Sequence, residues 1–111
     1  MTRLNIKPLS VNTAFTGVRY KTDEYKQYAK LVLLSLKPMK IPDGKLEIRY
    51  KFGLSNSGAD LDNCVKQFQD LLCAKYNFND NRIYRITAEK EIVRKETEFI
   101  EFEITTYDKN L

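Results

Sequence analysis

Hydrophobic and polar positions follow two periodicities along the chain, and together they predict six elements. Alternation of apolar and polar residues predicts four strands, at about residues 3–7, 45–52, 83–93 and 99–107. Apolar residues at helical spacing predict two helices, one between Thr22 and Pro38 and one from about residue 60 to Tyr76. No repeat or low-complexity segment interrupts this order. The order strand, helix, strand, helix, strand, strand indicates one domain over residues 1–111.

The ends of the first helix carry ordinary start and stop signals. Thr22 is a good N-cap, and Asp23 and Glu24 follow in the first turn, where carboxylates interact favourably with the helix dipole. Pro38 cannot continue a helix and therefore ends it. Residues 42–44 (PDG) predict a turn, while residues 10–20 and 53–58 predict irregular loops.

The side chains of each element divide between a buried and an exposed face. In strand 45–52 the apolar positions alternate with charged ones, so one face is buried and the outer face is mainly basic. In the second helix the predicted buried stripe leaves Asp62 and Lys66 outside it. The residues expected to be buried or to share an apolar face are Leu46, Ile48, Tyr50, Phe52; Leu61, Val65, Phe68, Leu72, Tyr76; Tyr84, Ile86, Ala88, Ile92; and Ile100, Phe102, Ile104.

This pattern predicts an α+β fold with order βαβαββ. We expect a two-layer sandwich in which a mixed or antiparallel four-stranded sheet carries both helices on one face. The other face of the sheet would then be exposed in a monomer. A second copy of the chain is the expected cover, so a homodimer is predicted.

The composition excludes several classes of catalytic and metal site. The chain has 19 basic and 15 acidic residues, a net charge of +4 and no histidine. Without histidine, Ser-His-Asp and Cys-His nucleophilic sites are excluded and a structural zinc site is strongly disfavoured. Cys64 and Cys73 lie in one predicted helix, too far apart for a disulfide, and are expected to be apolar fillers in a reducing compartment. No apolar run approaches the length of a membrane span, so we expect a cytoplasmic protein without membrane contact.

The candidate chemistry lies at the start of the second helix and in the loop after it. Asp60 and Asp62 precede Lys66 at helical spacing, and Asp80 follows in a polar loop before the next strand. Magnesium prefers carboxylate oxygens combined with water and substrate phosphate oxygens. Lysine would add a positive charge beside a scissile phosphate. The pattern therefore suggests a metal-dependent phosphodiesterase.

A purely structural interpretation fits the same residues. Asp60 can be an N-cap, Asp62 and Lys66 can form an exposed i,i+4 ion pair, and Asp80 can be a turn residue. These alternatives remain open from the spacing alone.

The chain resembles the RusA family of Holliday-junction resolvases, which occur in bacteriophages and prophages. The resemblance covers nearly the whole length and is most specific at residues 60–66 (DLDNCVK), followed by Asp80 ahead of Ile83. At the N-terminus, residues 8–12 and 19–21 are similar to the proline-serine-x-asparagine turn and the basic loop of that family.

The resemblance implies a site and a substrate. Asp60, Asp62 and Asp80 would hold Mg²⁺, with Mn²⁺ as an alternative, and Lys66 would assist at the phosphate. The protein would be a homodimer that cuts four-way DNA junctions in the cytoplasm of a bacterial host during recombination and repair. The candidate DNA contacts are Asn12, Arg19, Tyr20, Lys21 and Arg82, with Arg3, Lys7, Arg49, Lys51 and Arg85 as further basic residues.

Two rival functions belong to other classes. A small α+β domain with a basic strand face can bind single-stranded nucleic acid without cutting it. Alternatively, the chain can be a structural dimer that keeps the aspartates for capping. Only the enzyme should nick DNA in the presence of Mg²⁺, and the structural dimer should not bind a junction.

Overall fold

The computed structural model describes residues 1–10, 15–16 and 20–110. In chain order the elements are β1 (Thr2–Leu4), β2 (Phe15–Thr16), β3 (Tyr20–Lys21), α1 (Asp23–Ser35), β4 (Leu46–Leu54), α2 (Leu61–Tyr76), the 3₁₀ helix η1 (Asp80–Arg82), β5 (Ile83–Ile92) and β6 (Phe99–Thr106). In this described part of the chain, no helix is long and apolar enough to cross a membrane.

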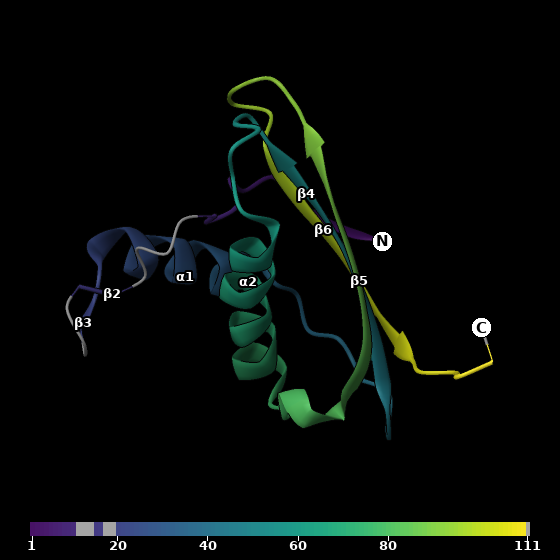
Figure 1. The fold of residues 1–111 in the computed structure, drawn as a ribbon. Helices are drawn as coiled ribbons and strands as arrows, with labels where there is room; N and C mark the ends of the chain where they lie inside the picture. The colour runs from purple at the N-terminus through teal and green to yellow at the C-terminus, as the bar shows by residue number, and fades with distance from the viewer. Residues whose placement is uncertain (11–14, 17–19, 111) are drawn as a thin grey trace.

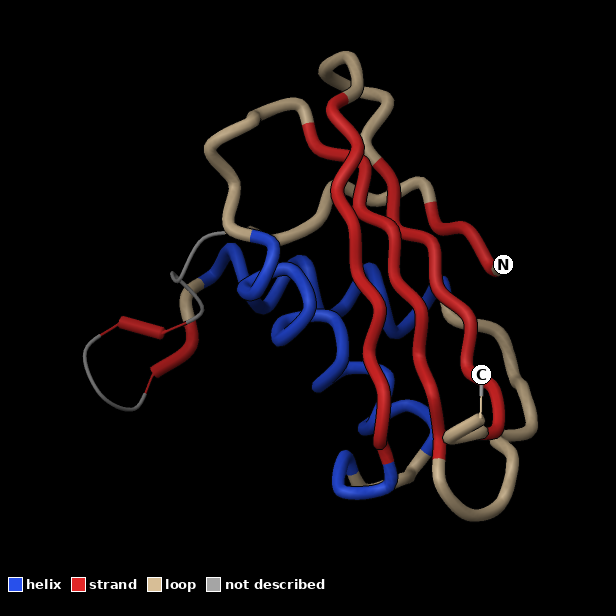
Figure 2. The backbone as a smooth tube through the Cα atoms, turned by 45° about the vertical axis from the view of Figure 1, so that its right-hand side comes forward, coloured by secondary structure: helices blue, strands red, loops and turns tan. Residues whose placement is uncertain are grey.

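The main sheet has the strand order β1-β6-β4-β5. Strand β6 runs antiparallel to β1 and β4, whereas β4 and β5 are parallel. Parallel neighbours need a crossover connection, and α2 provides it. Both helices lie on the same side of this twisted sheet (Figures 1 and 2). The predicted α+β fold, with a mixed four-stranded sheet and two helices, is confirmed.

Helix α1 starts at its predicted cap and is closed at its other end by α2. The Thr22 hydroxyl accepts a hydrogen bond from the Tyr25 amide at 3.2 Å. The last turn of α1 contains no basic residue. Instead, Lys75 Nζ donates to the Leu33 carbonyl at 3.1 Å, and the Tyr76 hydroxyl donates to the Lys37 carbonyl at 2.6 Å. These two contacts join the helices. The Lys75 cation also interacts favourably with the dipole at the C-terminal end of α1.

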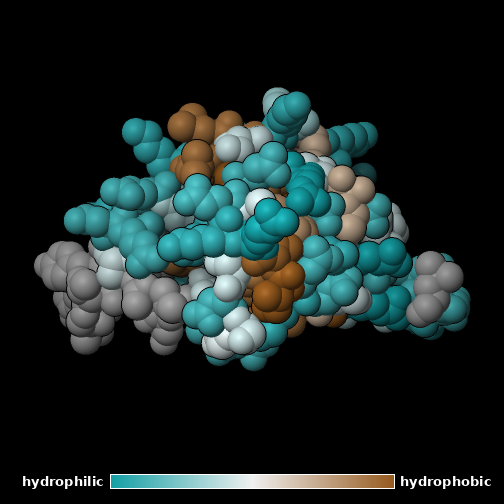
Figure 3. All heavy atoms as spheres, turned by 90° about the horizontal axis from the view of Figure 1, so that it is seen from above, coloured by the Kyte–Doolittle hydropathy of each residue, from teal (hydrophilic) through white to brown (hydrophobic). Residues whose placement is uncertain are grey.

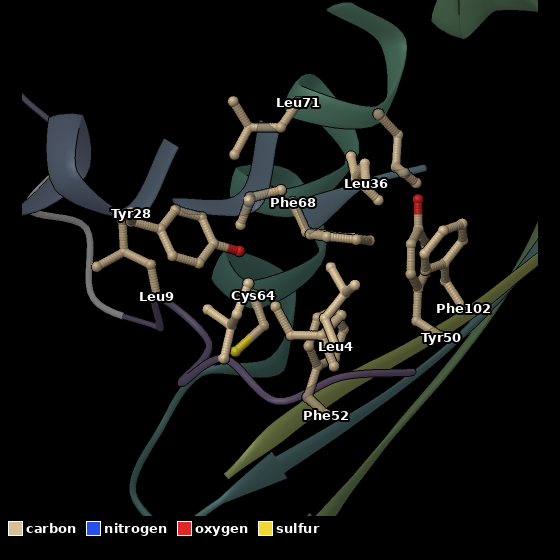
Figure 4. Packing of buried hydrophobic residues seen from close by; sticks show 14 of the residues in the cluster. Leu4, Leu9, Tyr28, Leu36, Tyr50, Phe52, Cys64, Phe68, Leu71 and Phe102 are labelled. Carbon is tan, nitrogen blue, oxygen red and sulfur yellow. The ribbon is translucent and has the colours of Figure 1, made fainter. Parts of the chain in front are cut away.

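The hydrophobic core lies between the helices and the sheet, and Phe68 of α2 is at its centre (Figure 4). The Phe68 ring centroid is 6.1 Å from that of Tyr50, 6.4 Å from Phe52 and 5.4 Å from Phe102. Burying an aromatic or aliphatic side chain of this size contributes about 1.5–3 kcal/mol. The packing of α2 on β4 and β6 therefore fixes the orientation of the helix.

The buried face of α2 is rotated from the predicted stripe. Its buried residues are Cys64, Gln67, Phe68, Leu71 and Leu72. Leu61 and Val65, which were expected in the core, are only half-buried. They lie at the margin of α2 that faces β5, an edge strand that covers less of the helix than the central strands do. Both cysteines are free, as expected.

Some element boundaries differ from the predicted ones. The first strand is shorter than predicted, and residues 15–16 and 20–21 pair antiparallel within a region expected to be irregular. Strand β4 continues through Gly53, which was assigned to a loop, and pairs there with both β5 and β6. Glycine is needed at this position because the Phe99 ring occupies the space where a side chain would lie. Tyr84 falls outside the predicted apolar row, because the β4–β5 register shifts there and its ring packs against Tyr107.

The sheet face away from the helices is charged and internally paired. Its ion pairs are Arg3–Glu101, Arg49–Glu47, Arg49–Glu103, Lys51–Glu91 and Arg85–Glu47. Acidic partners thus balance the face that was predicted to be basic. Because its charged side chains are paired within the chain, this face does not by itself require a second copy as cover. The homodimer stays a prediction.

Candidate functional site

An open depression of about 490 Å³ lies between α2, η1 and the first half of β5. Its charged lining residues are Asp62, Lys66, Asp70 and Asp80, and all four are exposed. The remaining lining residues are Leu61, Val65, Gln69, Ile86 and Ala88. The depression therefore has an apolar floor below a rim that carries three carboxylates and one ammonium group.

Asp60 has the structural role that the capping interpretation gave it. Its Oδ1 accepts a hydrogen bond from the Asp62 amide at 3.1 Å, and its Oδ2 is 3.5 Å from Asn63 Nδ2. It is the N-cap of α2 and does not line the depression. The N-cap prediction for Asp60 is confirmed, whereas its role as a metal ligand stays a prediction.

Asp62 and Lys66 lie on the exposed side of α2, as their position outside the buried stripe predicted. Within the part of the chain that the structure describes, neither side chain makes an ion pair within 4.0 Å or a side-chain hydrogen bond. The alternative of an Asp62–Lys66 ion pair is therefore not supported. Both charges remain available to a ligand in the depression.

The carboxylate of Asp80 likewise does not stabilise the turn in which it lies. Asn79 is the N-cap of η1, and its Oδ1 accepts a hydrogen bond from the Asn81 amide at 2.9 Å. Because Asn79 satisfies the turn, the carboxylate of Asp80 has no structural hydrogen bond among the described residues. It faces the depression from the end opposite to Asp62.

Asp70 and Gln69 belong to this site, although the sequence motif did not single them out. Asp70 follows Lys66 by one helical turn, so i,i+4 spacing was the signal that could have found it. Gln69 accepts a hydrogen bond at 2.8 Å from the hydroxyl of Tyr50, a residue of β4. Burial raises the pKa of Tyr50 and keeps this hydroxyl protonated. The core thus orients one polar side chain at the base of the depression.

The pKa values of the two cysteines of α2 depend on the charged groups near them. Burial, together with the charges of Asp80 and Asp70, raises the pKa of Cys73 to about 11. Burial also raises the pKa of Cys64 to about 11, with Asp60 acting in the same direction and Lys90 in the opposite one. Asp70 and Asp80 therefore both lie near Cys73, while Asp60 and Lys90 both lie near Cys64.

The three aspartates of the motif do not form a closed metal cage. Helix α2 has 16 residues, so its ends are about 24 Å apart at 1.5 Å per residue. Among the described residues, no group of three His, Cys, Asp or Glu side chains is close enough together to hold one metal ion. Magnesium is often bound by only one or two carboxylates plus water and phosphate oxygens, and the rim of the depression fits that mode.

The candidate DNA contacts have different outcomes. Asn12 and Arg19 lie outside the described residues, and Tyr20 and Lys21 form strand β3. Arg82 is engaged within the protein: its Nε donates to the Gly44 carbonyl at 2.9 Å, and its Nη2 donates to the Pro42 carbonyl. Arg82 thus anchors the turn before β4 to the start of β5.

Other basic residues on the chain are also partly engaged. Arg3, Arg49, Lys51 and Arg85 all take part in ion pairs on the outer face of the sheet. Lys7 lines a second cavity of about 370 Å³ beside α1, whose walls are largely apolar and which contains neither Asp62 nor Asp80. The lining of that cavity also includes two carboxylates, Glu24 and Glu98, which lie outside the sequence motif.

No protein-family model matches this chain, and no curated protein matches it.

Proposed function

We propose that the chain is a Mg²⁺-dependent endodeoxyribonuclease that hydrolyses phosphodiesters in four-way DNA junctions. The observation that carries the proposal is the depression lined by Asp62, Lys66, Asp70 and Asp80, whose side chains have no ion pair within 4.0 Å among the described residues. Asp60 and Arg82, by contrast, are engaged in a capping contact and a contact to a backbone carbonyl. The resemblance to RusA resolvases at residues 60–66 supplies the substrate class.

The charge of the depression favours a cation as a cofactor. Three carboxylates and one lysine give the lining a formal charge of −2, counted as three negative charges and one positive charge. A DNA phosphate would be repelled from such a surface unless a cation neutralised it. In a nucleic-acid-binding module without metal, these carboxylates would weaken DNA binding. This observation supports the enzyme over that rival.

The residues of the depression have distinct roles in this proposal. Asp62 and Asp80, at opposite ends of the depression, would each hold Mg²⁺ together with water and a phosphate oxygen, and Asp70 adds negative charge to the rim. When bound, Mg²⁺ polarises the phosphate and lowers the pKa of a bound water. Lys66 directs its ammonium group toward the negative charge that develops on the phosphate. Asp60 fixes the first turn of α2 and thereby the direction of Asp62.

Incubation with a synthetic four-way junction, with and without Mg²⁺, tests this function. We expect nicks at symmetric positions only in the presence of Mg²⁺, and a linear duplex of the same sequence serves as the control. Junction binding without cleavage in Mg²⁺ or Mn²⁺ would favour the binding module. Absence of both binding and cleavage would favour the structural protein.

We expect the active form to be a homodimer. A four-way junction has approximate two-fold symmetry, and two symmetry-related depressions would nick opposing strands. Light scattering at micromolar concentration should give twice the 13.0 kDa mass of the chain. A monomer that still makes paired cuts would contradict this prediction.

A further inference from the structure

Lys90 of β5 makes two contacts that reach across to the segment before α2. Its Nζ donates to the Ser57 carbonyl at 2.9 Å and to the Ala59 carbonyl at 3.0 Å. Both acceptors belong to the loop that connects β4 to α2. Hydrogen bonds from a charged donor are stronger than neutral ones. Lys90 therefore ties the loop to the edge strand of the sheet at two points.

The loop that Lys90 holds leads directly into the first turn of α2. The Asn56 side chain accepts a hydrogen bond from the Gly58 amide at 2.8 Å, and the Ala59 amide donates to the Asn56 carbonyl at 3.2 Å. Ala59 is buried and immediately precedes the N-cap Asp60. A displacement of the Ala59 carbonyl would therefore displace the first turn of α2.

The loop is also attached at its start, but that contact is distant from the helix. Ser55 Oγ donates to Glu98 Oε2 at 2.8 Å, which links the end of β4 to the β5–β6 turn. Lys90 is the described side chain that holds the other end of the loop, next to Asp60. In Figure 1 this loop lies at the same end of the sheet as the C-terminal end of β5.

Strand β5 connects the two ends of the depression. Asp80 lies in η1, which passes directly into Ile83 at the start of β5. Ile86 and Ala88 then form part of the floor, and Lys90 follows with the same alternation, on the helix-facing side of the strand. The strand thus holds Asp80 through the chain itself and holds the start of α2 through the Lys90 side chain.

We propose that Lys90 is a positioning residue that sets the place of Asp62 relative to Asp80 across the depression. The inference rests on the proposed function for its catalytic consequence, but its structural part can be measured separately. A lysine is an unexpected choice for this position on local grounds, because a cation near a helix N-terminus opposes the macrodipole. Asp60 and the two carbonyl groups offset that unfavourable interaction and hold the ammonium group at this point.

The test compares Lys90→Met, Lys90→Arg and the control Lys95→Met. Methionine keeps the apolar stem but removes the donors, whereas arginine retains donors. Lys95 lies exposed in the β5–β6 turn, so its replacement removes the same charge from the same end of the sheet. We expect single-turnover junction cleavage in Mg²⁺ to be ~10–100-fold slower for Lys90→Met, because small misplacements of catalytic groups carry costs of this order. Lys90→Arg should restore most of the rate, and Lys95→Met should cleave like the wild type.

Hydrogen exchange gives a readout that does not depend on cleavage. The amides of Ala59 and Asp62 are hydrogen-bonded within the segment that Lys90 holds. In Lys90→Met these amides should exchange about tenfold faster through local opening, while core amides in β4 remain unchanged. Junction affinity in Ca²⁺ should stay within about twofold of wild type, since one charge contributes little to many phosphate contacts. Should Lys90→Met fail to fold in urea titrations, Lys90→Gln is measured in its place.

The outcomes separate this inference from the proposed function. If the wild type cleaves and Lys90→Met matches it in both rate and exchange, the positioning role is wrong. Equal slowing of cleavage by Lys95→Met would assign the effect to charge and would also overturn it. If the wild type does not cleave at all, the proposed function fails. Unchanged hydrogen exchange in Lys90→Met would then also show that Lys90 does not position the first turn of α2.

Discussion

Replacing Asp62 with asparagine is expected to abolish Mg²⁺-dependent nicking while leaving the fold intact. Asp62 is exposed at the rim of the depression and has no structural partner among the described side chains. Asparagine has nearly the same shape, so the change removes a ligand charge without opening a cavity. Loss of one preorganised charge from a reaction site typically slows the reaction by ~10²–10³-fold, and a metal ligand should belong to the upper part of that range.

Folding and binding measurements separate this effect from a loss of structure. Asp62 lies in the first turn of α2, where its interaction with the dipole contributes about 0.3–1 kcal/mol, so only a small decrease in the free energy of unfolding is expected. Asp23→Asn is a matched control, because Asp23 lies exposed in the first turn of α1. Junction binding in Ca²⁺ should persist in both variants. Undiminished cleavage by Asp62→Asn would rule out the proposed site.

Replacing Lys66 with alanine should reduce turnover far more than affinity. One exposed cation contributes no more than about one unit to the slope of log affinity against log salt concentration. A group directed at developing charge can be worth ~10²–10³ in rate. Since no ion pair within 4.0 Å joins Lys66 to any described residue, its removal should leave stability close to that of the wild type.

Single-turnover cleavage at saturating protein, set beside a binding isotherm in Ca²⁺, measures the two quantities separately. Lys26→Ala provides the control, because Lys26 is an exposed lysine on α1, the other helix. It should change neither the rate nor the affinity appreciably. Near-wild-type single-turnover rates for Lys66→Ala would show that the lysine is only a surface charge.

Figure 3 shows the hydropathy of the surface from above. From above, most of the surface is hydrophilic, and hydrophobic atoms are confined to small areas. Exposed apolar residues do occur beside the depression, where Ile86 is 45% exposed on the edge strand β5.

Part of the site was predictable because it depends on local periodicity. Helical spacing placed Asp62 and Lys66 outside the buried stripe, and the capping preference of aspartate placed Asp60 at the start of α2. The same rules missed Asp70, because an exposed carboxylate one turn beyond Lys66 looks like any solvated charge. Its significance depends on Asp80, which approaches only after the chain reverses at Asn77, a residue in the left-handed conformation.

The sequence by itself determined the number and type of the main elements, the caps of both helices and the α+β class. These features depend on interactions within one or two turns or along one strand, where the residues involved are close in sequence. Only the tertiary structure decided the strand order β1-β6-β4-β5, the rotation of the buried face of α2 and the contact of Lys90 with the Ala59 carbonyl. The reason is that packing between distant segments selects among many arrangements that the same local pattern allows.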